Sequence, residues 1–513
     1  MGAPPSPAPA VAAEGLAHRA DYAARWRLLS GILQGGLQFA VGVALARLLA
    51  PDDFGIAALA SVVVGLAALL LDLGIGSAVI QRRELSDGHI RAAFTLGMVL
   101  GALVMALLWM LAPWIAVLMR VEALTPILRV ESILFLLSGV GVTARALLQR
   151  RLSFRTLFLV DLLSYAIGYA AVALALAMQG FGVWSLVAGA VLQSLLSNGL
   201  VLMVVRHPVR PLLRREETAE LLRFASGSAV NGAVNHLAFH GDNLVVGRML
   251  GTHALGLYAR AFTLMMLPLG FMGNALFSIL FPALSELQRE RERFARAYLT
   301  ATAGLTLAMG PVLAAMAVAG PHLVAGLYGE PWRGSAAAFQ VLCAVGLLRV
   351  AAMPAGAVTH ASGQVFAELR RQVVYAAWVL AAAFIGSAWG ITGVAVGVGT
   401  AITYKYLAMV GLSLDIAGIS WRRYLGAQAP GLWLAVFVGL LALGVRWTGE
   451  LLGFGSLGIA LAIAAVSALA LPTGIHLLPG PLRPSTLFDH LERSVSPLPA
   501  PVRLPLAWAM RRG

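Results

Sequence analysis

Runs of about twenty apolar residues recur along almost the whole sequence and limit the folds that it can adopt. A helix needs about that many apolar residues to cross the hydrocarbon core of a bilayer. The chain of 513 residues is 59% hydrophobic and 12% charged, whereas soluble domains carry about 25% charged residues. The sequence therefore predicts an all-α polytopic membrane protein with about fourteen transmembrane helices, at 26–49, 55–80, 91–119, 124–148, 156–178, 181–205, 224–250, 254–284, 297–320, 336–358, 366–388, 391–414, 424–445 and 452–478.

Positive charge is concentrated in alternate connections between these runs. Together with the two tails, these connections hold 28 of the 37 arginine and lysine residues. Such an excess is typical of cytoplasmic loops. The pattern predicts cytoplasmic tails at 1–25 and 479–513, with both termini inside, and it explains the net charge of +14 without nucleic acid. Residues 1–25 lack the apolar segment of a cleavable signal peptide.

A polar stripe within one apolar run occurs twice, at a separation of 201 residues. Ser30 corresponds to Asn231 and Gln34 to Asn235, and Gln38 shares a helix face with Ser30 and Gln34. We therefore predict two parallel repeats of six helices, with lobes at 26–206 and 224–414, a linker at 207–223 and two extra helices within 424–478. The stripes predict a central cavity between the lobes; the alternative is that they only help helices to pack.

The motifs of catalysis, nucleotide binding and metal binding are weak or missing from this sequence. It contains no P-loop and no large connection on the outer side for catalytic residues. His236, His240 and Asp242 have only weak metal-ligand spacing, and the single Cys343 adds no metal motif. We expect a transporter rather than an enzyme, with no metal and no cofactor, that works by alternating access between the repeats.

Two long segments resemble a known family. LARLLAPDDFGIAALASVVVGLAALLLDLGIGSAVIQRRELSDGHIRAAF (45–94) and FASGSAVNGAVNHLAFHGDNLVVGRMLGTHALGLYARAFTLMMLPLGFMGNALFSILFPALSELQ (224–288) are similar to the two halves of Wzx-type polysaccharide exporters. These belong to the MOP superfamily, which also contains the MATE drug antiporters and the lipid II flippases. The resemblance covers about residues 26–414 and is strongest to the colanic-acid exporter branch.

The resemblance implies a function and an architecture. It implies two V-shaped bundles that move an undecaprenyl-pyrophosphate-linked oligosaccharide from the cytoplasmic to the periplasmic leaflet of a bacterial inner membrane. The product would serve exopolysaccharide, capsule or lipopolysaccharide O-antigen synthesis. A proton or sodium gradient could drive the step, and the partners would be membrane lipids, a polymerase and export proteins.

Arg349 and Lys405 are the candidates for binding the pyrophosphate. Arg349 lies 14 residues after Ser335 and Lys405 lies 14 residues after Ile391, so the two cations are expected at similar depth. A charge at the centre of a bilayer costs ~2.5–3.5 kcal/mol on insertion scales, so a compensating role is expected. The alternatives are extension of the side chains to the interface, or pairing with Asp242 or Asp161.

The remaining candidates have other roles. Arg47 and Arg248 lie at the outer ends of their helices, where they would guide the head group or only favour the helix C-termini. Asp72 and Asp242 are candidates for ion coupling, because a carboxylate within the membrane can bind a proton or a cation. The polar side chains suited to sugar hydroxyls are Ser30, Gln34, Gln38, Asn231 and Asn235.

Three other functions compete with export of lipid-linked sugars. A MATE-like cation-coupled exporter of small organic compounds would need an acidic, aromatic cavity, and the first helix here has no acidic residue. A membrane-embedded glycosyltransferase or polymerase would need a catalytic outer loop. A scaffold for polysaccharide enzymes would not need matching polar stripes.

Overall fold

A computed structural model describes residues 31, 33–71, 75–82, 85–205, 208 and 228–479. All regular structure in these ranges is helical, and within them ten stretches are long and apolar enough to cross a membrane. Each predicted run coincides with helical residues in the described ranges, so the all-α membrane fold is confirmed. Two compact units divide the chain: unit 1 within Met1–Leu49 and Leu59–Ala233, and unit 2 within Ala50–Ala58 and Val234–Gly513.

Unit 1 includes helical residues 33–48, and its main hydrophobic core lies between α3, α4, α6, α7 and α9. A π-helical turn, which the sequence does not predict, interrupts one span where Gly168 lies against the backbone of α9. The labelled helices are α2 (Pro51–Leu71, whose first turns belong to unit 2), α3 (Ile75–Gln81), α4 (Asp87–Met119), α5 (Leu124–Glu131), α6 (Ile133–Arg150), α7 (Phe154–Leu163), η1 (Ser164–Ala171), α8 (Val172–Met178) and α9 (Val183–Val204).

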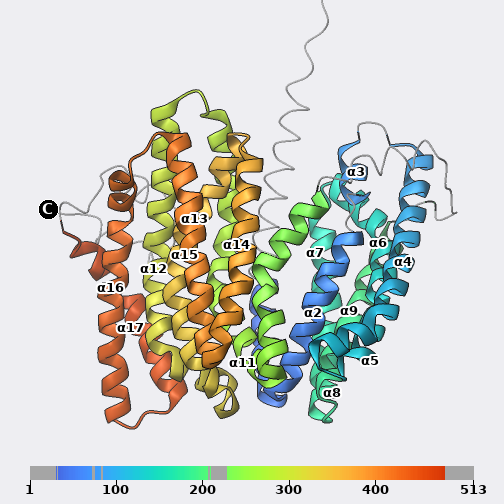
Figure 1. Ribbon diagram of the computed structural model, residues 1–513, viewed down its shortest axis with the longest axis horizontal. Coiled ribbons are helices and arrows are strands. Elements are labelled where there is room, and N and C mark those ends of the chain that lie inside the picture. The colour runs from blue at the N-terminus through green and yellow to red at the C-terminus, as the bar shows by residue number, and fades with distance from the viewer. Residues whose placement is uncertain are drawn as a thin grey trace, which may run out of the picture. The chain divides into compact units, whose positions relative to one another are not determined.

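Unit 2 contains longer helices, among which α16 and α17 lie beside α12 (Figure 1). Gly251, at φ 85°, separates two helices that form one continuous element, and its positive φ suits glycine. The elements are α11 (Ser228–Glu286), α12 (Arg291–Tyr328), η2 (Glu330–Ser335), α13 (Ala336–Ala361), α14 (Val365–Gly386), η3 (Ser387–Trp389), α15 (Gly390–Ala417), α16 (Trp421–Leu451) and α17 (Ser456–His476).

The core of unit 2 is built on buried aromatic side chains. Tyr298 of α12 and Tyr424 of α16 stack with ring centroids 5.9 Å apart, and both are fully buried. The Tyr424 hydroxyl donates to the backbone oxygen of Ala351 at 2.8 Å, so the ring also fixes α13. This core holds α13 and α15, which carry the two membrane-level cations, in a fixed arrangement.

Residues 50–58 join unit 2 through an aromatic contact and two glycines. Phe54 packs edge-on against Trp332 at 5.3 Å. A Cβ added to Gly55 would overlap the Thr252 carbonyl, and one added to Gly256 would overlap the Pro51 carbonyl. The contact is reciprocal, because Pro51 and Thr252, like Gly55 and Gly256, are separated by the 201 residues of the repeat.

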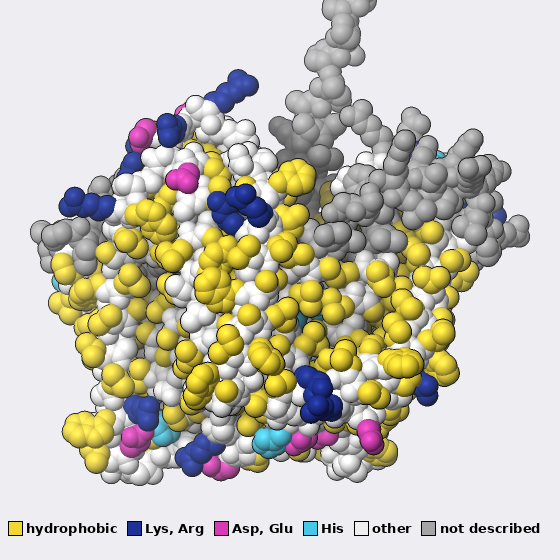
Figure 2. Space-filling view, viewed as in Figure 1, with side chains coloured by type: hydrophobic (Ala, Val, Ile, Leu, Met, Phe, Trp, Pro, Cys, Tyr) yellow, Lys and Arg dark blue, Asp and Glu magenta, His cyan; other side chains and the backbone are white. Residues whose placement is uncertain are grey.

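The visible face of unit 2 has the surface of a membrane protein. Hydrophobic side chains cover its middle, and charged side chains lie mainly towards its two ends (Figure 2). In water such a face would be an aggregation hazard, whereas in lipid it is the expected surface. The predicted lobe limits and the predicted cavity between the lobes stay predictions.

Candidate functional site

Four helices of unit 2 bring charged and aromatic side chains together at membrane level. Asp242 and Tyr258 come from α11, Arg349 from α13, Tyr375 from α14 and Lys405 from α15. Three of these, Asp242, Arg349 and Lys405, are residues that the sequence analysis selected for different reasons. Their meeting in one cluster makes this part of unit 2 the candidate site.

Arg349 is half-buried among weak partners. Its Nη2 lies 3.5 Å from the Tyr375 hydroxyl and its Nη1 lies 3.7 Å from the Met266 sulfur. The guanidinium carbon lies 5.0 Å from the Phe239 ring centroid and 5.5 Å from that of Phe262, which are cation–π distances. A guanidinium has five N–H donors, so these long contacts leave it able to bind an oxyanion.

Lys405 shares Tyr375 with Arg349. Its ammonium lies 4.7 Å from the centroid of the Tyr375 ring, and the two cations influence each other electrostatically. Within the described ranges, no carboxylate lies within 4.0 Å of either cation. Two like charges that flank one tyrosine in this way would be stabilised by an anion placed between them.

Asp242 is buried, with an exposed fraction of 2%, and is held by hydrogen bonds. One of its carboxylate oxygens accepts a 2.7 Å hydrogen bond from the Tyr258 hydroxyl, and the other accepts the Asn243 backbone N–H at 2.9 Å. Arg349 is close enough to influence Asp242 electrostatically but makes no direct ion pair with it. The carboxylate therefore belongs to the cluster without neutralising Arg349 by contact.

Unit 1 contains a similar arginine that is fully paired. Arg145 of α6 makes a two-point contact with Asp161 of α7, at 2.8 and 3.1 Å. Its Nη2 also donates to the Ser197 hydroxyl of α9 at 2.6 Å. Asp161 is thus engaged by Arg145 and Ser197 within unit 1.

Arg145 and Arg349 lie at similar distances from the first residues of their helices. Arg145 is the thirteenth residue of α6 and Arg349 the fourteenth of α13. Ser197 is the fifteenth residue of α9 and Lys405 the sixteenth of α15. Where α7 has Asp161 as its eighth residue, α14 has a neutral amide, Gln372.

Gln372 is buried, and its amide nitrogen has no hydrogen-bond partner among the described residues. It lies one turn before Tyr375 on the same face of α14. Unit 2 has two cations, Arg349 and Lys405, and a buried amide donor on α14, together with Glu368, which influences Lys405 electrostatically. This donor set suits a polyanionic group such as a pyrophosphate.

The other predicted residues differ in exposure, and some lie outside the described residues. Arg248 is half-buried in α11, and Asn235 is exposed near the start of the same helix. In unit 1, Gln34 is half-buried, whereas Gln38 and Arg47 are exposed. Ser30, Asp72 and the side chain of Asn231 lie outside the described residues.

The histidines of α11 lie together without forming a recognisable metal centre. The His236 and His240 rings have centroids 4.8 Å apart. No group of three metal-ligand side chains occurs in the ranges that the structure describes. The predicted roles of Arg47, Arg248, Asp72 and the polar stripe stay predictions.

Sequence reasoning missed Tyr258, Gln372 and Tyr375. The two tyrosines lie within apolar runs and look like core residues. Gln372 directly follows Arg370 and Arg371, so it looks like part of a charged helix end. The eighth-residue match between Asp161 and Gln372 becomes visible only once the helix boundaries are known.

Comparisons to known proteins identify the family and the fold. Residues 44–337, more than half of the chain, match the family described as polysaccharide biosynthesis protein. The chain belongs to this family.

Two relatives are similar in sequence to this family member over much of its length. It is 25% identical over 447 residues to the lipopolysaccharide biosynthesis protein WzxC of Escherichia coli, covering 83% of this chain and 88% of WzxC. It is 30% identical over 309 residues to the succinoglycan biosynthesis transport protein ExoT of Rhizobium meliloti, covering 60% of this chain and 62% of ExoT. A family member with these relatives is a multi-pass membrane protein of the Wzx type.

Solved structures of other membrane transporters share the fold of this family member. The lipid II flippase MurJ in an inward closed conformation matches with a TM-score of 0.69 at 12% identity, over 86% of this chain and 97% of MurJ. A MATE-family multidrug resistance transporter in an inward-facing conformation matches with a TM-score of 0.59 at 18% identity, over 76% of this chain and 96% of that one. The chain therefore shares the fold of these two transporters.

Proposed function

We propose that this protein is a flippase for undecaprenyl-pyrophosphate-linked oligosaccharides. It would move them from the cytoplasmic to the periplasmic leaflet of a bacterial inner membrane by alternating access, for exopolysaccharide, capsule or O-antigen synthesis. The observation that carries the proposal is the pair of half-buried cations, Arg349 and Lys405, that flank Tyr375 without a carboxylate within 4.0 Å in the described ranges. The names of WzxC and ExoT, which refer to polysaccharide biosynthesis and transport, support it.

The cation pair suits the pyrophosphate, which is the part of such a substrate that is hardest to move out of water. A pyrophosphate that leaves water needs charged donors in place of its hydration shell, because an isolated buried ion is strongly destabilised. Arg349 supplies a planar fork for phosphate oxygens, and Lys405 supplies a compact charge on the other side of Tyr375. The site binds and positions an anion; it contains no nucleophile–base pair for chemistry on it, which supports a transporter rather than an enzyme.

Asp242 would couple the movement to an ion gradient. A proton or sodium ion on Asp242 would change the electrostatic potential at Arg349 and so the affinity of the site for an anion. Arg47 and Arg248 would guide the head group at the outer ends of their helices. Ser30, Gln34, Gln38, Asn231 and Asn235 would contact sugar hydroxyls, and Asp72 would be a second coupling residue.

The setting of the protein follows from the same proposal. Both termini would lie in the cytoplasm, where the substrate is assembled. A polymerase and export proteins would be the partners on the other side, since a flipped oligosaccharide is a building unit. No cofactor other than the ion gradient would be needed.

Proteoliposomes provide the test of the proposal. They would contain the purified protein and a labelled undecaprenyl-pyrophosphate oligosaccharide, and an external glycosidase would report which leaflet carries the sugar. We expect protein-dependent transfer that increases when a proton or sodium gradient is applied. Absence of transfer for several bacterial oligosaccharides, with uptake of an organic cation instead, would overturn the proposal.

A MATE-like exporter of small organic cations is the second candidate. The buried carboxylate of Asp242 favours it, because a carboxylate attracts cations. Arg349 and Lys405 oppose it, since Arg349 beside Asp242 and Lys405 beside Tyr375 would repel a cationic drug. The uptake arm of the proteoliposome assay separates the two functions.

A further inference from the structure

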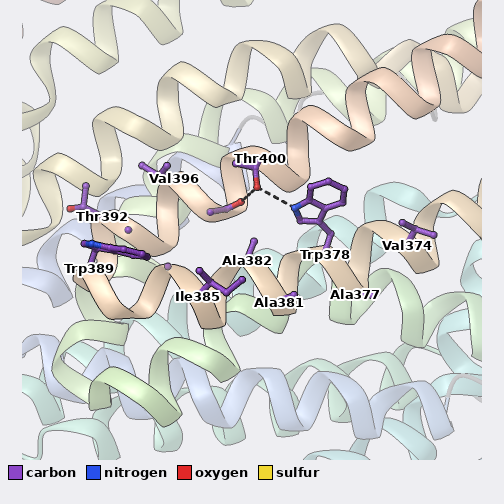
Figure 3. A pocket seen from close by; sticks show the side chains of 13 residues that line it. Val374, Ala377, Trp378, Ala381, Ala382, Ile385, Trp389, Thr392, Val396 and Thr400 are labelled. Carbon is purple, nitrogen blue, oxygen red and sulfur yellow. Dashed lines mark hydrogen bonds between the residues drawn. The ribbon is translucent and has the colours of Figure 1, made fainter.

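An apolar groove runs along the seam between α14 and α15. It has a volume of about 980 Å³ and is open to the surface of unit 2. Trp378 and Trp389 lie towards its opposite ends, with Ile385 and Val396 along its sides (Figure 3). Ile385, Trp389 and Val396 are more than half exposed, so the groove walls project from the membrane-level surface.

Small residues form the floor of the groove. Gly386 and Gly393 touch so closely that a Cβ on either would overlap the backbone oxygen of the other. Gly397 likewise touches the Ala382 carbonyl. The helices therefore meet backbone to backbone, which leaves a strip about 18 Å long between Val374 and Gly386 with few side chains over it.

One end of the groove adjoins the cation pair. Trp378, which lines the groove, stacks on Tyr404 with centroids 5.2 Å apart, and Tyr404 directly precedes Lys405. Trp378 also donates from its indole nitrogen to the Thr400 hydroxyl at 3.2 Å. Val374, at the same end, directly precedes Tyr375, whose ring carries the Lys405 ammonium.

The end of the groove at Val374 and Trp378 thus lies at the same height along α14 and α15 as the proposed anion site at Tyr375 and Lys405. From that level the groove runs towards η3, the connection between α14 and α15. A ligand with an anionic head and a long hydrocarbon tail fits both features at once. The proposed substrate has both parts, a pyrophosphate head and a long polyprenyl chain.

Resting on the proposed function, we propose that the α14–α15 groove binds the polyprenyl chain of the lipid-linked substrate while Arg349 and Lys405 bind its pyrophosphate. The groove is then a binding site for the carrier lipid, distinct from the site for the head group. Contact with this chain would keep the substrate attached while the sugar crosses.

Photo-crosslinking tests which lipid the groove holds. An undecaprenyl phosphate with a diazirine near the middle of its chain would be irradiated with the full-length protein in liposomes, and labelled peptides would be mapped by mass spectrometry. We expect labelling within 374–400 that excess undecaprenyl phosphate suppresses and excess phosphatidylglycerol does not. Equal suppression by both lipids, or labelling of all membrane-facing helices alike, would overturn the inference.

Affinity measurements separate the groove from the cation pair. Ala381 lines the groove and is exposed, so Ala381→Phe fills the groove from its open side without entering the core. We expect this variant to lower the affinity for undecaprenyl pyrophosphate by at least about tenfold and to leave that for geranyl pyrophosphate unchanged, because the short chain does not fill the groove. Val396→Trp should act in the same way.

A matched control and the remaining outcomes complete the design. Ala465→Phe makes the same change at an exposed alanine of α17 and should alter neither affinity. Unchanged affinity of both groove variants for the long chain, or equal loss for both chains, would contradict the groove as a chain site. If the wild-type protein bound neither pyrophosphate, the proposed function itself would fail, and this inference with it.

Discussion

The Lys405 ammonium lies 4.7 Å from the centroid of the Tyr375 ring. The hydroxyl of the same tyrosine lies 3.5 Å from Arg349. One side chain therefore fixes the distance between two cations that come from different helices. This relationship determines the shape of the proposed anion site and gives the first prediction.

Substitution of Tyr375 should separate the two contacts. Tyr375→Phe keeps the ring under Lys405 and removes the long contact with Arg349, so affinity for undecaprenyl pyrophosphate should fall by less than about tenfold. Tyr375→Leu removes both and leaves a cavity, so affinity should fall by clearly more. Equal affinities for the two variants in a titration would contradict a role for the ring.

Gln372 should be sensitive to charge rather than to size. Gln372→Glu restores the carboxylate that Asp161 supplies in unit 1 and should attract Arg349 and Lys405. Affinity for undecaprenyl pyrophosphate should then fall at least about tenfold, which corresponds to ~1.4 kcal/mol. The size-matched control Gln372→Met should lose less, and a Gln372→Glu variant that bound as tightly as the wild type would refute the neutral-amide explanation.

The reciprocal glycines should be required for stability. Gly55→Ala and Gly256→Ala each place a methyl group where a backbone carbonyl lies, so the backbone must shift. We expect each substitution to lower the free energy of unfolding by about 1–3 kcal/mol or more. Thermal unfolding in detergent should show a lower midpoint for both. Gly304→Ala in α12 is the control, because a Cβ there meets nothing within 4 Å; equal midpoints for all three variants would contradict the close contact.

Asp242 should be required for coupling of transport to the ion gradient. Asp242→Asn keeps the shape of the side chain but cannot carry a proton or hold a cation, so transport should lose its response to an imposed gradient while exchange without a gradient continues. Tyr258→Phe removes the 2.7 Å hydrogen bond, a charge-assisted contact of about 1.5–3 kcal/mol, and should shift the pH dependence of transport. Full gradient response in Asp242→Asn would exclude this residue from coupling.

The sequence predicted the helices well because their main determinant is local. An apolar run of sufficient length must form a helix in lipid, and counting from helix ends placed Arg349 and Lys405 at similar depth. The π-helical turn at η1 was not predicted, because it depends on the close approach of Gly168 to α9. The position of residues 50–58 within unit 2 depends on contacts such as Phe54 against Trp332, which no local pattern reveals.

The neighbours of the two cations could not be predicted in the same way. They depend on how far each helix is rotated about its axis, and length and charge do not fix that rotation. Tyr375 could have faced lipid or core, and only the packed arrangement of α13, α14 and α15 brings it between the cations. The repeat offers partial information, since Gln372 occupies the place of Asp161, but this comparison needs the helix boundaries.

The most direct test of the central claim is transport by Arg349→Gln, Lys405→Gln and the double variant, with Arg446→Gln as control because Arg446 pairs with Glu450 away from the site. The proteoliposome assay with a labelled undecaprenyl-pyrophosphate oligosaccharide would give initial rates at equal amounts of inserted protein. Loss of at least about tenfold in each single variant, further loss in the double variant and a wild-type rate for the control are the predicted results. Wild-type rates in the double variant would contradict the proposal that these two cations carry the pyrophosphate.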